Sequence, residues 1–83
     1  MEGDVIPFPL ARRRDYVRRQ ADWLAQQSEV AAERNLSRQL AQQRETLLRR
    51  GVDHASADAE VAALEKAIRA EIWSLAHIRG GAA

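Results

Sequence analysis

The sequence predicts an all-α protein, a long antiparallel helical hairpin with an extended N-terminal arm. Residues 10–50 contain neither proline nor glycine and consist mostly of Ala, Leu, Arg, Gln and Glu, which favour helix. Gly51 interrupts this run, and helical apolar spacing resumes beyond it as far as Ile78. We therefore expect two helices, at residues 11–50 and 56–78.

The arm comprises residues 1–9. It holds both prolines of the chain, Pro7 and Pro9, which restrict the residues before them to extended conformations. Residues 10–79 are expected to form a single helical hairpin domain, and residues 80–83 a C-terminal tail that opens with two glycines. One small domain agrees with a length of 83 residues.

The turn between the helices is expected to begin at Gly51. Arg49 and Arg50 precede it, so cations occupy the last turn of the first helix, where the helix dipole favours them. Gly51 itself tolerates the left-handed conformation that ends many helices. Either Asp53 or Ser56 can then cap the second helix.

Three large apolar pairs set the expected register of the hairpin. Antiparallel helices join positions whose residue numbers have a constant sum, and a sum of 108 satisfies all three pairs. This register leaves residues 11–28 without a partner, although they carry an apolar face. The pairs are Leu47 with Val61, Leu40 with Ile68, and Leu36 with Ile72.

The uncovered part of the first helix can be covered by the arm, by a second copy of the chain or by another protein. Two hairpins side by side would bury it, so we expect a homodimer with four helices packed as in a coiled coil. Its interface would include Val17, Leu24 and Trp73.

Composition is typical of a soluble cytoplasmic protein. The absence of cysteine excludes disulfides, thiolate metal ligands and cysteine nucleophiles. No apolar stretch approaches the roughly 20 residues that span a bilayer. The net charge is only +1, but residues 1–50 hold ten arginines against seven acidic residues, so the positive charge belongs to one end.

The sequence carries no signature of catalysis. His54 and His77 lie 23 residues apart, at opposite ends of the second helix, so they cannot share a metal ion. The serines have no adjacent histidine or nucleophile elbow, and no glycine-rich loop is present to hold an oxyanion or a phosphate. We therefore expect no enzyme activity, metal, cofactor or small-molecule substrate.

The arginine cluster, residues 12–19, is a candidate contact surface. Its arginines surround the helix, and Tyr16 and Trp23 lie beside them. Such a surface can dock on an acidic protein, or it can straddle phosphates while the rings stack on bases. Alternatively, Asp15 and Asp22 pair with the arginines and only keep the helix soluble. The five arginines are Arg12, Arg13, Arg14, Arg18 and Arg19.

The arm is a second candidate contact. Residues 5–9 read Val-Ile-Pro-Phe-Pro, an apolar and stiff segment that loses little entropy when it docks into a groove. Ile6 and Phe8 would be its anchors on a partner protein. The arm could instead pack against Trp73 and complete the core of its own chain.

Several segments also carry a family resemblance: VIPFP at 5–9, RR at 12–13, VR at 17–18, AER at 32–34, RRGV at 49–52 and AIRAEIW at 67–73. They resemble a group of short proteins, common in alphaproteobacterial genomes, that is known only as a domain of unknown function. The resemblance covers nearly the whole chain and implies a soluble helical protein. It supplies no catalytic or binding residue.

These observations favour a small non-enzymatic protein-interaction or regulatory module that acts through the arm and the arginine cluster. The alternative is a small nucleic-acid-binding protein that contacts phosphates through the same arginines. Salt dependence separates the two, because phosphate contacts weaken steeply with salt and an apolar contact does not.

Overall fold

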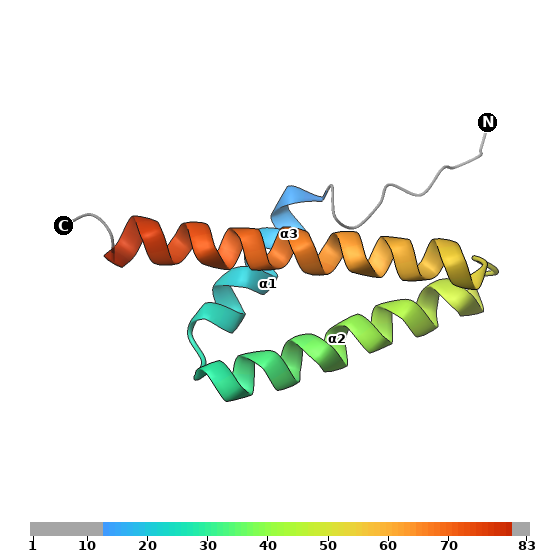
Figure 1. Cartoon of the computed structure of the whole chain (residues 1–83), viewed down its shortest axis with the longest axis horizontal. Helices are drawn as coiled ribbons and strands as arrows, with labels where there is room; N and C mark the ends of the chain where they lie inside the picture. The colour runs from blue at the N-terminus through green and yellow to red at the C-terminus, as the bar shows by residue number, and fades with distance from the viewer. Residues whose placement is uncertain (1–12, 81–83) are drawn as a thin grey trace.

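The computed structural model describes residues 13–80, which form three helices and no strand (Figure 1). The helices are α1 (Arg14–Ala25), α2 (Glu29–Arg49) and α3 (His54–Gly80). The all-α class is confirmed. Every helix within this range is too short or too polar to cross a lipid bilayer.

The prediction of one continuous helix over residues 11–50 is wrong, because the chain breaks at residues 26–28. Ser28 takes an extended conformation there, with φ −63° and ψ 159°, and starts α2 as its N-cap. Its Oγ accepts a hydrogen bond of 3.2 Å from the backbone N–H of Ala31. A serine cap satisfies a backbone donor that a new helix would otherwise leave unpaired, so Ser28 favours the break.

The predicted turn at Gly51 is confirmed. Gly51 has φ +95°, and its N–H donates to the carbonyl of Leu48 at 3.0 Å. The N–H of Val52 donates to the carbonyl of Leu47 at 3.0 Å, which completes the Schellman pattern of helix ends.

Of the two candidate caps for the second helix, Asp53 takes the position. Its Oδ2 accepts a hydrogen bond of 3.0 Å from the N–H of Ser56. Helix α3 consequently begins at His54, two residues before the expected start.

Helices α2 and α3 run antiparallel from this turn and diverge (Figure 1). Helix α1 crosses α3 and connects to the start of α2, where the two longer helices are farthest apart. The core lies where the three helices meet. A fully buried Ala57 also packs at the start of α3. The buried core cluster consists of Val17, Ala21, Leu24, Leu36, Leu64 and Ile68.

The fold covers the apolar face of α1 in a way that we did not expect. Because α1 turns back across α3, the same chain buries Val17 and Leu24, which the sequence placed in a dimer interface. In this conformation neither side chain is open to a second copy. Of the three expected interface residues, Trp73 alone is exposed, at 62%.

Two ion pairs join α2 to α3. Arg44 Nε lies 2.6 Å from Asp58 Oδ1, and Arg69 Nη1 lies 2.7 Å from Glu33 Oε2. The residue numbers of each pair sum to 102 and not to 108. Long side chains reach along a helix, so these ion pairs do not fix which apolar residues of α2 and α3 face each other. The register expected from the three apolar pairs stays a prediction.

Candidate functional site

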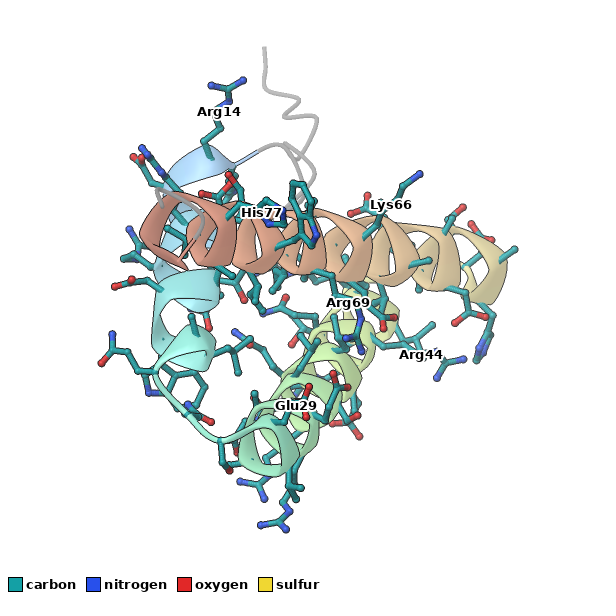
Figure 2. The ribbon with its side chains drawn as sticks, turned by 60° about the vertical axis from the view of Figure 1, so that its left-hand side comes forward. Arg14, Glu29, Arg44, Lys66, Arg69 and His77 are labelled. Carbon is teal, nitrogen blue, oxygen red and sulfur yellow. The ribbon has the colours of Figure 1, made fainter. Side chains whose placement is uncertain are left out.

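Helix α1 presents its arginines to solvent because its apolar side faces the core. Val17, Ala21 and Leu24 follow the spacing of one helical face and are buried. Arg13 precedes the helix and, like the three arginines on it, is exposed. Figure 2 shows the side chain of Arg14 extending away from the three helices. The exposed arginines of the helix are Arg14, Arg18 and Arg19.

Tyr16 lies between helices, although the sequence suggested a contact with a partner. Its side chain is half-buried, and its hydroxyl accepts hydrogen bonds from Gln39 Nε2 at 3.1 Å and Gln43 Nε2 at 3.2 Å. Gln39 Nε2 also donates to Gln20 Oε1. This polar network ties α1 to α2, so the Tyr16 ring is not a free stacking platform.

Trp23 remains accessible, with half of its surface exposed. It lines a shallow pocket of about 370 Å³ between α1 and α2, together with Arg38 and four amide side chains. Arg19 lies one turn before Trp23 on the same side of α1. We call the exposed residues Arg19, Trp23 and Arg38 the tryptophan patch; Arg38 lines the pocket with Trp23, and Arg19 precedes Trp23 by one turn.

Arg18 makes only a weak contact with the body of the protein. Its Nε lies 3.8 Å from Glu71 Oε2 of α3, and 74% of the Arg18 side chain is exposed. Exposed ion pairs at this distance contribute little, so Arg18 can exchange this partner for another at small cost.

A larger hollow lies where α2 and α3 diverge (Figure 1). This groove has a volume of about 550 Å³, and all three helices line it. Arg69 lies between α2 and α3 along it, and Glu29 lies at its α2 end (Figure 2). The apolar lining residues are Leu24, Ala25, Ala32, Ile72, Trp73, Leu75 and Ala76.

Arg69 holds the two sides of the groove together. Its guanidinium donates two hydrogen bonds to Glu33 of α2, at 2.7 and 2.8 Å, and one of 2.9 Å to Glu65 of α3. The bonds from Arg69 lower the pKa of Glu33, and the two carboxylates raise the pKa of Arg69. Together with Glu29, the group holds three carboxylates against one guanidinium, a net charge of −2.

Trp73 stands at the edge of the groove, and its ring stacks on His77. The ring centroids are 3.7 Å apart, with an angle of 29° between the planes. The two tryptophans therefore belong to different surfaces, since Trp23 lines the shallow pocket and Trp73 lines the groove.

Some expected site residues fall outside the described range. The arm, including Ile6 and Phe8, and also Arg12 lie before residue 13. Within residues 13–80, no three side chains of His, Cys, Asp or Glu gather in a way that could hold a metal ion. The expectation that the protein is not an enzyme stays a prediction.

Sequence reasoning missed the groove and the amide network. Gln20, Gln39 and Gln43 carry no signal of a shared network while the chain is treated as one straight helix. Nothing in the sequence marks Glu33 and Arg69 as neighbours, and only the diverging helices reveal that they border a hollow. The exposed arginines of α1 are the part of the site that the sequence located.

Comparison with known proteins gives one match. A family model described as "Family of unknown function (DUF6074)" covers residues 1–83. Neither the curated proteins nor the solved structures contain a match to the chain.

Proposed function

We propose that this chain, which belongs to the DUF6074 family of unknown function, is a non-enzymatic protein-interaction module that binds a partner protein through the tryptophan patch. The observation that supports it most is the half-exposed Trp23, held on a helix whose other side is buried. Exposed tryptophan forgoes stabilisation by burial, and Trp and Arg are the residues most enriched at binding hot spots.

The chemistry of the patch favours an acidic partner surface. Arg19 and Arg38 are both exposed and can donate paired hydrogen bonds to carboxylates, while Trp23 adds a large apolar surface. The arm, with Ile6 and Phe8, would extend the same contact from the N-terminal side of α1. A regulatory role would then consist of occupying or releasing the partner, without any chemical step.

Affinity capture from cells that make the protein tests the proposal, with nuclease treatment and quantitative mass spectrometry. Trp23→Ala should remove the specific partner. Arg49→Ala, which changes an exposed arginine at the far end of α2, should retain it. With the purified partner, calorimetry should show a loss of affinity of at least about tenfold for Trp23→Ala. Equal capture by both variants and the wild type would exclude the patch as the contact.

Nucleic-acid binding is a second candidate because Arg13, Arg14, Arg18 and Arg19 are all exposed. It is less favoured because the net charge is only +1 and acidic residues are interspersed among the arginines. Fluorescence anisotropy with single-stranded DNA and RNA decides between the candidates. Binding that weakens steeply with salt and is lost in the Arg13→Ala, Arg14→Ala double variant would replace the protein-interaction proposal.

The arm can be tested separately on the same partner. Phe8→Ala should weaken an arm contact with little dependence on salt, because it removes apolar surface and no charge. If Phe8→Ala binds as tightly as the wild type while Trp23→Ala does not, the patch is sufficient and the arm is not part of the contact.

A further inference from the structure

We propose that the groove between α2 and α3 binds an amphipathic helix of another protein, one that carries an apolar stripe flanked by basic residues. The proposal goes beyond the function proposed above, because no residue of the tryptophan patch lines the groove. The protein would thus offer two contact surfaces that share no lining residue.

The arrangement of the helices supplies the shape. Helices α2 and α3 diverge from the Gly51 turn, and α1 crosses at the open end (Figure 1). A hollow of about 550 Å³ is bordered by the end of α1, the start of α2 and the C-terminal half of α3. Two helices that diverge around a hollow can accept the side chains of a further helix, as amphipathic helices do in apolar grooves.

The lining of the groove supplies the apolar contact. Ile72 and Leu75 pack against the core on one side and are only partly buried. Trp73 is 62% exposed and Ala76 is also exposed, and both line the groove. Small side chains beside a large exposed aromatic ring suit the entry of apolar side chains from outside.

The charges around the groove select basic flanks. Arg69 is already occupied by Glu33 and Glu65, so it does not attract an incoming carboxylate. Glu29 and Glu33 line the groove together with Arg69, so its lining has a net charge of −1. Lysine or arginine on the incoming helix would be attracted to these carboxylates, and one of them could also lie on the face of Trp73.

A second copy of the chain does not offer such a helix within residues 13–80. Helices α1 and α2 each carry a net charge of +1, but Val17, Ala21 and Leu24 of α1 are buried in the core of their own chain, and so is Leu36 of α2. Presenting the apolar face of α1 to another molecule would require α1 to leave α3. Within residues 13–80 the chain itself supplies no free amphipathic helix, and the proposal assigns the groove to a segment of a different protein.

The test uses the full chain, labelled with ¹⁵N, and a synthetic peptide of about 14 residues made of leucine at helical spacing and lysine elsewhere. One control peptide has the same composition with the leucines dispersed around the helix, and a second has glutamate in place of lysine. Trp23→Phe assigns the two indole N–H signals. We expect the Leu/Lys peptide to shift the Trp73 indole and the Ala32 and Ala76 amides, and to leave the Trp23 indole in place.

A matched pair of variants locates the site. Ala76→Arg places bulk and positive charge in the groove, whereas Ala70→Arg makes the same change at another exposed alanine of α3 that does not line it. Binding of the Leu/Lys peptide should weaken at least tenfold in Ala76→Arg and stay within about twofold in Ala70→Arg. Circular dichroism of both variants should match the wild type.

Several results would overturn the proposal. Equal binding of the dispersed peptide would exclude helix recognition, and equal or tighter binding of the glutamate peptide would exclude the charge argument. Equal loss in both variants, shifts centred on Trp23, or no binding of the Leu/Lys peptide would exclude the groove. Concentration-dependent shifts at Ala76 without peptide would make a second copy the occupant. None of these results affects the Trp23→Ala test of the proposed function.

Discussion

Arg69 of α3 and Glu33 of α2 form a two-pronged pair, with Nη1 to Oε2 at 2.7 Å and Nη2 to Oε1 at 2.8 Å. The residues are 36 positions apart, so the pair links two helices that are distant in the sequence. Arg69 Nε also donates to Glu65 on its own helix, which orients the guanidinium plane. The groove proposed as a docking site is bordered by this pair.

We predict that Arg69→Lys lowers the midpoint of thermal unfolding, by at most a few degrees, because an ammonium cannot make both parallel bonds and keep Glu65. The effect should shrink at high salt, since the side chains are about half exposed. Lys66→Arg is the control, because Lys66 is exposed on α3 and makes no ion pair with Glu33. If the midpoint of Arg69→Lys falls by the same amount at low and high salt, the contribution of the pair to stability is not mainly electrostatic.

Stability should fall below about pH 4.5. Hydrogen bonds from Arg69 lower the pKa of Glu33 below its ordinary value of 4.5. Hydrogen bonds from Ser56 likewise lower the pKa of Asp53 below its ordinary value of 3.8. In the folded state both groups remain ionised where the unfolded chain binds protons. Their contribution is therefore complete above the ordinary values and is lost as the pH falls through the folded values.

Urea unfolding over a pH series measures this dependence. Glu33→Gln should remove the part of the acid dependence that comes from Glu33 and keep the part that comes from Asp53. If the stability of the wild type and of Glu33→Gln changes identically with pH, the folded-state pKa of Glu33 is not lowered.

Gly51→Ala should destabilise the protein by about 1 to 2 kcal/mol, because φ is +95° at this position and a Cβ disfavours the left-handed region. A Cβ on Gly51 would meet no atom within 4 Å, so the loss would come from the backbone alone. Gly51→Asn should cost less, since asparagine tolerates this conformation better. Denaturant unfolding measures the free energy of unfolding of both variants. Equal losses in Gly51→Ala and Gly51→Asn would show that the backbone conformation at Gly51 is not the cause.

Ser28→Ala should cost about 1 kcal/mol, the usual loss for an N-cap. The hydroxyl of Ser28 accepts from Ala31 at the start of α2, and alanine cannot. Ser28→Asp should keep the stability of the wild type, because a carboxylate also caps and favours the positive end of the helix dipole. If Ser28→Ala is neutral and raises the helical circular dichroism signal, the break at residues 26–28 is not held by the cap.

Tyr16→Phe should destabilise the fold by about 0.5 to 1.5 kcal/mol and leave partner binding unchanged. It removes the oxygen that accepts from Gln39 and Gln43, and Gln39 Oε1 is already buried without a hydrogen-bond partner. Thermal unfolding and the partner titration are measured on the same sample. Weaker partner binding at full stability would assign Tyr16 to the contact surface after all.

The sequence located the turn at Gly51 because the stop signal is local. A glycine after two arginines, followed by Asp53, sets the end of one helix and the start of the next whatever packs around them. It missed the break at residues 26–28 because Gln26 and Gln27 are good helix formers and the cap is a single hydroxyl, that of Ser28.

One signal could have revealed the break. Leu24 and Leu36 lie 12 residues apart, which places them roughly 120° apart around a continuous helix. One straight helix therefore cannot point both at the same partner, yet both lie in one core cluster. The groove could not be predicted in the same way, because it depends on the angles between helices and not on local pattern.

The most direct test of this account is an isotope-filtered nuclear Overhauser experiment on a mixture of labelled and unlabelled chains. If α1 folds back within its own chain, the Tyr16 ring should show contacts with the Gln43 side-chain amide, which donates to its hydroxyl at 3.2 Å, and those contacts should arise only within one chain. On a continuous helix these residues would lie roughly 40 Å apart. Contacts that appear only between chains, or an unbroken helical pattern through residues 26–28, would contradict the fold and both proposed surfaces.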